Sequence, residues 1–244
     1  MTAPKQLADL SWPNVPDRPL VLVPIGSIEQ HGPHLPFDTD TVIAAAAADA
    51  CVARLIDVID NEVVIAPPIT YGASGEHQLF PGTISIGHDA LRIMLIELVR
   101  SLSYWAGRIV FVNGHGGNVP TIAEVVNQLI IEQHDVAWVP CAFEGATDAH
   151  AGHDETSVML FLDPQRVDME RAITGNTSHL SEILPDLMES GVRAVSESGV
   201  LGNPLHADEA QGRRLFDGLV DDLCTRIFNG SVGSDGQLLS PQLY

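Results

Sequence analysis

Four short apolar runs alternate with longer amphipathic segments along this chain. The runs are rich in β-branched residues and end near Gly, Pro or Asn: LVLVPI (20–25), VVIAP (63–67), RIVFVN (108–113) and VAWVPC (136–141). Such runs are typical of strands buried on both faces of a parallel sheet. The other segments have helical length and period, at 39–57, 88–106, 118–133, 153–162 and 206–228. The alternation predicts an α/β fold, a three-layer α/β/α sandwich with a mostly parallel central sheet.

We expect one domain over residues 1–228, of which 1–18 form a polar, Pro-containing N-terminal arm. Residues 229–244 contain much Gly, Ser and Asn. This composition buries little apolar surface, so it predicts a flexible C-terminal tail.

Charge and cysteine content narrow the function classes. The 244 residues include 12 Lys+Arg and 32 Asp+Glu, a formal net charge of −20. This balance disfavours nucleic-acid binding and anionic membrane surfaces, which both need clustered cations. Cys51, Cys141 and Cys224 are far apart and lack CxxC spacing. This pattern predicts reduced thiols, and with no apolar segment long enough for a signal or a span it predicts a cytoplasmic protein.

The first strand is followed by GSIEQHGPHLPFDTD (26–40), which offers Glu29, His31, His34, Asp38 and Asp40. In α/β sheets, ligands bind beyond the carboxyl ends of the strands. Mixed imidazole and carboxylate donors suit Zn²⁺, Mn²⁺ or Fe²⁺. A solvated acidic loop is the alternative interpretation, although such loops rarely combine His with carboxylates between Pro turns.

The third run leads into NGHGGN (113–118), which places His115 at a strand end. Gly116 and Gly117 would let backbone N–H groups at a helix start approach a ligand and stabilise an oxyanion. A Gly-rich turn that carries His115 by chance is the alternative.

The fourth run is followed by FEGATDAHAGHDETS (143–157). His150 lies just before a predicted helix and could donate or accept a proton in the same crevice. Asp154 and Glu155 could bind metal or simply complement the helix dipole. A further Gly-rich loop, YGASGEHQLFPGT (71–83), supplies Glu76 and His77. These two either contact substrate or belong to a structural turn.

With these motifs the sequence resembles the creatininase family of metal-dependent amidohydrolases. The matching pieces are GSIEQHGPHLPFDTD, HQLFPGT, VNGHGGN, HAGHDETS and GVLGNP, in this order over roughly residues 20–210. The resemblance implies a three-layer α/β/α fold, homo-oligomeric assembly and two divalent metal ions, Zn²⁺ or Fe²⁺ with Mn²⁺ as a further option. A water whose pKa the metals lower would attack an amide carbonyl.

The resemblance also implies a ligand set. Glu29, Asp40 and His115 would hold one metal, and His31, Asp40 and a glutamate the other, with Asp40 bridging. In creatininase that glutamate stands where this chain has Gly117, and Glu155 is its natural replacement. Asp154 remains open as an alternative to Glu155.

Further roles are hypotheses about the mechanism. His150 would pass a proton to the leaving amine, Gly116 and Gly117 would hold the oxyanion, and His77 would contact substrate. His34 and Asp38 would orient the metal ligands.

Two segments, GNTSHLSEILPDL (175–187) and GVRAVSESGVLGNP (191–204), are similar to one branch of this family. Members of that branch release a C-terminal Val–Tyr dipeptide from a small modified precursor peptide, which would be the substrate here. A creatininase-like or formamide-type small-molecule amidohydrolase is the alternative, and a metal-storing protein without activity is a more distant one.

Overall fold

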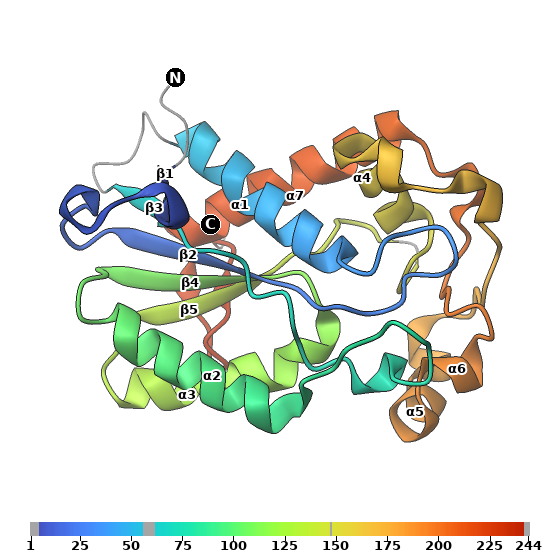
Figure 1. Cartoon of the computed structure of the whole chain (residues 1–244), viewed down its shortest axis with the longest axis horizontal. Coiled ribbons are helices and arrows are strands. Elements are labelled where there is room, and N and C mark those ends of the chain that lie inside the picture. The colour runs from blue at the N-terminus through green and yellow to red at the C-terminus, as the bar shows by residue number, and fades with distance from the viewer. Residues whose placement is uncertain (1–4, 56–61, 147, 242–244) are drawn as a thin grey trace.

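A five-stranded parallel sheet forms the centre of the molecule in a computed structural model that describes residues 5–55, 62–146 and 148–241 (Figure 1). Its strand order is β1-β3-β2-β4-β5. The strands are β1 (Lys5–Gln6), β2 (Leu20–Ile25), β3 (Val63–Ile65), β4 (Arg108–Asn113) and β5 (Val136–Pro140). In the register of the two central strands, Leu20 pairs with Arg108 and Ile25 with Asn113. The carboxyl ends of β2 and β4 therefore lie side by side.

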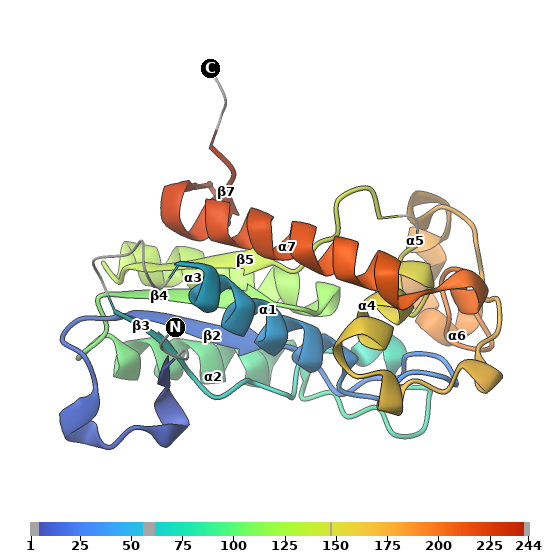
Figure 2. The ribbon, with the colours of Figure 1, turned by 90° about the horizontal axis from the view of Figure 1, so that it is seen from above.

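Helices cover both faces of the sheet, with α2 and α3 on one side and α1 and α7 on the other (Figure 2). The α-helices are α1 (Thr39–Leu55), α2 (Gly87–Leu102), α3 (Val119–Ile131), α4 (His153–Leu162), α5 (Leu180–Ser190), α6 (Val192–Val195) and α7 (Glu209–Asn229). The 3₁₀ helices are η1 (Leu7–Asp9), η2 (Trp12–Asn14), η3 (Gly75–His77), η4 (Gly116–Asn118), η5 (Pro164–Arg166), η6 (Met169–Arg171) and η7 (Pro204–His206). The three layers confirm the predicted fold class.

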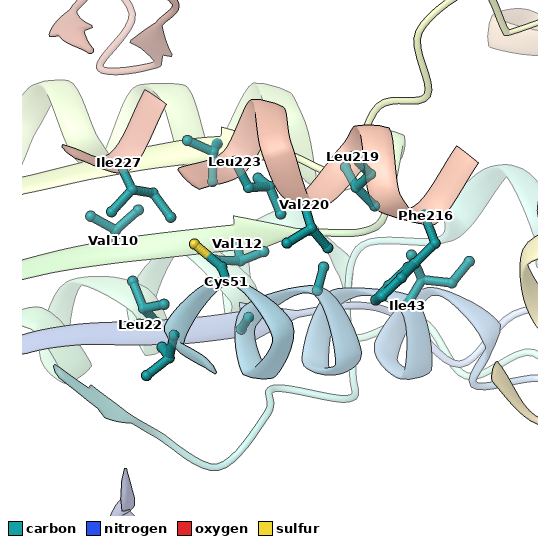
Figure 3. Packing of buried hydrophobic residues seen from close by; sticks show 14 of the residues in the cluster. Leu22, Ile43, Cys51, Val110, Val112, Phe216, Leu219, Val220, Leu223 and Ile227 are labelled. Atoms are coloured by element: carbon teal, nitrogen blue, oxygen red, sulfur yellow. The ribbon is translucent and has the colours of Figure 1, made fainter. Parts of the chain in front are cut away.

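Alternate residues of each strand point into two separate cores, because successive side chains on a strand face opposite sides. On β2, Leu20 and Leu22 pack on the α1 and α7 side, whereas Val21 and Val23 pack on the α2 and α3 side. Figure 3 shows the first of these cores, where α7 lies over α1 and the central strands. The side chains it labels are Leu22, Ile43, Cys51, Val110, Val112, Phe216, Leu219, Val220, Leu223 and Ile227.

The predicted elements agree closely with the observed ones. All four apolar runs contain strands, and the segment predicted as a helix at 153–162 is α4. The end of the helix predicted at 39–57 lies partly outside the described residues. Sequence reasoning did not predict α5 or α6. Among the described residues, no helix is long and apolar enough to cross a membrane.

The chain ends differ from their predictions. Within the N-terminal arm, β1 adds an edge strand to the sheet by pairing with β3. At the other end, β6 (Ser231–Val232) and β7 (Leu238–Leu239) form an antiparallel ribbon in place of the predicted flexible tail. Leu238 is fully buried, and the indole N–H of Trp138 donates to the carbonyl of Asp235 at 3.0 Å. One apolar side chain and one capped indole thus fix this segment despite its polar composition.

Candidate metal centre

Four of the predicted ligands lie together at the carboxyl-terminal edge of the sheet. Glu29 and His31 follow β2, His115 follows β4, and Asp40 lies in the first turn of α1. Each exposes no more than 4% of its surface. Ionisable groups are rarely buried to this extent unless they pair with one another or bind a metal.

Two glycines bring the start of α1 close to the strand ends. A β-carbon on Gly26, directly after β2, would lie 2.3 Å from Oγ1 of Thr41. A β-carbon on Gly114, directly after β4, would lie 2.4 Å from the carbonyl oxygen of Asp40. Only glycine fits at these two positions, so backbone packing places Asp40 between the two strand ends.

The two oxygens of Asp40 face two different histidines. Oδ1 lies 3.0 Å from Nε2 of His31, and Oδ2 lies 3.4 Å from Nδ1 of His115. One carboxylate is therefore shared between two imidazoles that come from different loops. This is the arrangement expected of an aspartate that bridges two metal positions.

Glu29 lies beside Asp40 and also faces His115. Its Oε2 is 3.1 Å from Nδ1 of His115, and Oγ of Ser27 lies 2.8 Å from Glu29 Oε2 and 2.7 Å from Asp40 Oδ2. The fully buried Ser27 hydroxyl holds the two carboxylates together. Sequence reasoning missed Ser27, because a serine beside a glutamate has no distinctive spacing.

Two further histidines lie near Oε1, the other carboxylate oxygen of Glu29. Nε2 of His77 lies 3.2 Å from Glu29 Oε1, and Nδ1 of His150 lies 3.7 Å from the same atom. The His77 and His150 rings are stacked obliquely, with centroids 4.5 Å apart. Both residues are buried, so His77 belongs to the cluster itself and not to an exposed turn. Glu29, His77 and His150 form another group that could hold a metal ion.

The GVLGNP segment holds His150 in position. The backbone of His150 pairs with Leu201, whose N–H donates to the His150 carbonyl at 2.8 Å. The side-chain amide of Gln30 donates to the carbonyl of Gly199 at 3.1 Å and lies 2.9 Å from Nδ1 of His77. Gln30 thus joins the first loop to this later segment, a role that its residue type did not signal.

Glu155 lies beside His31 and His150. It forms with His31 and His150 a group whose candidate ligand atoms lie within 4.8 Å of one another. Its Oε2 also accepts from the backbone N–H of Ala151 at 2.5 Å. In the part of the chain that the structure describes, no such group includes Asp154, which lies 3.2 Å from Nδ1 of His153.

Glu76 lies on the far side of His115. Its Oε1 is 3.4 Å from Nε2 of His115, and Glu29, Glu76 and His115 form a third group with metal-binding potential. The carbonyl of Ala73 lies 3.1 Å from the same nitrogen. A hydrogen on Nε2 can therefore be donated to Ala73 or Glu76, which leaves Nδ1 free to face Glu29 and Asp40.

The two residues predicted to orient the ligands, His34 and Asp38, have different surroundings. Nε2 of His34 lies 2.9 Å from Oγ1 of Thr156, the neighbour of Glu155, which is compatible with an orienting role. The carboxylate of Asp38 instead pairs with Arg166 at the surface. The prediction for Asp38 is not supported, because its position before α1 points its side chain away from the cluster.

Gly116 and Gly117 lie at the border between the cluster and a cavity of about 1030 Å³. Gly116 begins η4, and the first N–H groups of a helix have no acceptor within the helix. A β-carbon on Gly116 would meet nothing within 4 Å, so its backbone faces open space. This is the environment that the oxyanion role requires.

Burial and opposite charges shift the pKa values of the cluster. Burial alone would raise the pKa of Glu29, but the charge of His115 and its hydrogen bond to the carboxylate hold that pKa well below its usual range. Burial lowers the pKa of His31, but the Asp40 carboxylate raises it to about 10. His115 likewise has a raised pKa, because Glu29 outweighs the effect of its burial. In contrast, burial and the neighbouring His150 lower the pKa of His77 to about 2.

These shifts describe a centre of ionised carboxylates and charged imidazoles shielded from water. His31 and His115 each hold a proton toward the carboxylates. Divalent cations would replace these protons, because a metal and a proton compete for the same nitrogen lone pair. The donor set of imidazole nitrogens and carboxylate oxygens suits Zn²⁺, Fe²⁺ or Mn²⁺. The residues therefore fit divalent metal binding.

Known proteins resemble this chain in sequence. Residues 8–227 match the family model for creatininase, described as creatinine amidohydrolase. A relative from Mycolicibacterium smegmatis, the mycofactocin precursor peptide peptidase, is 53% identical over 220 residues, which cover 90% of this chain and 89% of the relative.

Two solved structures share the fold. A Bacteroides fragilis protein assigned to the creatinine amidohydrolases superimposes with a TM-score of 0.78 at 24% identity, covering 92% of this chain and 95% of the other. A creatininase variant of the Zn–Zn type gives a TM-score of 0.71 at 22% identity, covering 91% and 96%.

Proposed function

The chain belongs to the creatininase family, and on this premise we propose that it is a metal-dependent peptidase. Its substrate would be the mycofactocin precursor peptide, from which it would release a C-terminal Val–Tyr dipeptide. The observation that carries the catalytic part of this proposal is Asp40, whose two carboxylate oxygens face His31 and His115 separately.

Glu29, Asp40 and His115 would hold one metal, and His31, Asp40 and Glu155 the other. When bound, divalent ions at these positions would lower the pKa of water and polarise an amide carbonyl. Zn²⁺ or Fe²⁺ fits these donors, and Mn²⁺ is a further option. The role of Glu155 is supported by its place in one group with His31 and His150.

His150 would move a proton to the leaving amine. Its Nε2 lies 2.7 Å from the carbonyl oxygen of Gln30, to which an Nε2–H donates. The lone pair of Nδ1 then faces Glu29 and the centre of the cluster. This tautomer can accept a proton at Nδ1 and deliver it to a nitrogen that departs from the same side.

Gly116 and Gly117 supply backbone N–H groups at the start of η4. Donors that are fixed before the reaction stabilise a developing oxyanion without reorganising. Gly116 faces open space next to His115, so a substrate carbonyl can approach its main chain.

Glu76 keeps His115 in its orientation. By accepting from Nε2 together with the Ala73 carbonyl, it directs Nδ1 toward Glu29 and Asp40. Such partners of ligating histidines fix the tautomer and the ring plane. Glu76 is therefore a positioning residue in this proposal.

The adjoining cavity favours a peptide over a small cyclic or formamide substrate. Drug-sized ligands occupy pockets of about 300–1,000 Å³. The cavity that reaches the centre at Glu76, Gly116 and Gly117 measures about 1030 Å³. A volume at the upper end of that range exceeds what creatinine or formamide needs.

The proposal also includes the wider expectations from the sequence. The enzyme would act in the cytoplasm as a homo-oligomer, and neither nucleic acid nor membrane would be a partner. The three free cysteines support the cytoplasmic location, and the net charge of −20 supports the exclusion of nucleic acid and anionic membranes as partners.

The test combines metal analysis with mass spectrometry. Purified protein loaded with Zn²⁺ or Fe²⁺ is incubated with precursor peptide ending in Val–Tyr, and the released dipeptide is quantified. We expect dipeptide release that a chelator abolishes and that added metal restores. Release of ammonia or formate from small amides, or hydrolysis of creatinine, without dipeptide release would contradict the proposal.

Three variants assign the roles. Asp40→Asn should lose bound metal and turnover together, whereas His150→Gln should keep the metal and lose turnover. Asp38→Asn is the matched control, because Asp38 lies two residues before Asp40 but pairs with Arg166 at the surface. It should keep both metal and turnover.

A further inference from the structure

A largely apolar cavity lies beside the candidate metal centre. Its inner end is lined by Glu76, Gly116 and Gly117, which also border His115. Its outer wall is the helix α5, through Leu180, Leu184 and Met188. We call the space between these two walls the α5 groove.

The α5 wall presents a row of apolar side chains that face away from the protein core. Leu180, Leu184 and Met188 are spaced four residues apart, so they lie along one side of the helix. They expose 42%, 40% and 77% of their surface. Another side of α5 already has its own core, since Ile183 is buried against Val192. The exposed row is therefore not needed to hold the helix in the fold.

Exposed main chain also contributes to the lining of the groove. Gly75, Gly87 and Gly116 line the groove, and a β-carbon at any of them would meet nothing within 4 Å. Glycines that face open space allow another backbone to approach closely. A groove lined by an apolar helix face and by exposed glycine main chain suits an extended peptide with apolar side chains.

We propose that the α5 groove binds the apolar residues of the peptide substrate that flank the scissile bond, including the valine of the released dipeptide. This inference rests on the proposed peptidase function and adds the element that selects the substrate. Continuity with the centre supports this occupant, because Glu76, Gly116 and Gly117 belong to both. The segment at 175–187, which the catalytic chemistry does not use, thereby gains a role.

The test compares two matched double variants. Leu184→Ser with Met188→Ser makes the groove wall polar. Ile130→Ser with Ile131→Ser is the control, because these α3 residues expose 39% and 84% of their surface and do not line the groove. Each enzyme is assayed, as the metal-loaded full chain, on peptides that end in Val–Tyr or in Ser–Tyr.

We expect the groove variant to raise KM for the Val–Tyr peptide roughly tenfold or more, with kcat and metal content close to those of the wild type. Loss of contacts to a few methylenes gives an effect of this size. The preference of the wild type for the Val–Tyr peptide over the Ser–Tyr peptide should shrink in the same variant. The control variant should keep both the KM and the preference.

A second variant changes the glycine main chain that lines the groove. A β-carbon at Gly75 would meet nothing within 4 Å, so Gly75→Leu would place a side chain in the groove and should also raise KM. An unchanged KM in both groove variants, with normal turnover by the wild type, would overturn the groove assignment and leave the peptidase proposal intact. A groove variant that only changes the oligomeric state, measured by light scattering, would show that a second copy covers α5 and would overturn it too. A wild type that releases no dipeptide from any peptide would overturn both.

Discussion

The side chain of Glu76 occupies the space that a side chain at Gly117 would need. A β-carbon on Gly117 would lie 2.4 Å from Oε1 of Glu76 and 2.4 Å from Nε2 of His115. The carboxylate that approaches this face of His115 therefore comes from the loop after β3 and not from the NGHGGN segment. The glycine and the glutamate depend on each other sterically.

Gly117→Ala should weaken metal binding by roughly tenfold or more, because the new methyl group displaces the partner that orients His115. The carbonyl of Ala73, at 2.7 Å from the same point, is backbone and cannot move aside easily. Metal affinity is measured by competition with a chelating dye. Gly116→Ala is the control for affinity, because its β-carbon would face open space. Equal affinities for the two variants would contradict this steric coupling.

Glu76→Ala should lower metal affinity by about 10–100-fold while two metals still bind at saturation. Glu76→Gln should lie between the wild type and Glu76→Ala, because the amide oxygen can still accept from Nε2 of His115. Metal content is determined by mass spectrometry at saturating metal. A fall from two metals to one in Glu76→Gln would show instead that Glu76 is itself a ligand.

His34 should make the stability of the fold depend on pH. Burial lowers its pKa from 6.5 to about 4, with a further contribution from the nearby His31 and His150. The unfolded chain therefore binds a proton at a pH where the folded protein does not, and this group's stabilisation is complete above pH 6.5 and lost as the pH falls to about 4.

The wild type should therefore lose more unfolding free energy than His34→Gln over this interval, by an amount on the order of 2–3 kcal/mol. Urea denaturation between pH 7 and 4 measures both proteins. Parallel pH profiles for the two would rule out a buried neutral His34.

The C-terminal ribbon should contribute to stability through one residue. Leu238 is fully buried in the core on the α1 and α7 side, whereas its neighbour Leu239 is 43% exposed. Leu238→Ala should cost about 2–5 kcal/mol of unfolding free energy, and Leu239→Ala less than about 1 kcal/mol. Urea denaturation of both variants measures the difference. Similar losses, or none for Leu238→Ala, would show that the segment is as loosely held as its composition predicted.

The sequence predicts the sheet well because its central strands are buried on both faces. Leu20 to Ile25 form a continuous apolar run, and no solvent-facing alternation obscures it. Topology then explains the convergence of Glu29 and His115, since parallel strands end at the same edge of the sheet. No long-range contact had to be known for this part of the prediction.

The remaining features depend on contacts that cannot be predicted from residue types alone. Ser27 and Gln30 are ordinary polar residues whose importance comes only from their neighbours in space. Helix α5 contains Pro185, which argues against a helix when the sequence is considered alone. Asp38 shows the opposite case, since its place in a metal-binding motif predicted an orienting role and its position before α1 gave it a surface ion pair.

The close fit of Gly26 and Gly114 against the first turn of α1 has a consequence for how this architecture can diversify. It fixes Asp40 by main-chain contact, independently of the loops that follow β3 and β5. The parts of those loops that do not carry Glu76, His77, His150 or Glu155 can be lengthened, shortened or rewritten to admit another amide while the shared aspartate stays in register with the strands. New specificity could thus evolve on this scaffold without rebuilding the part that performs the hydrolysis.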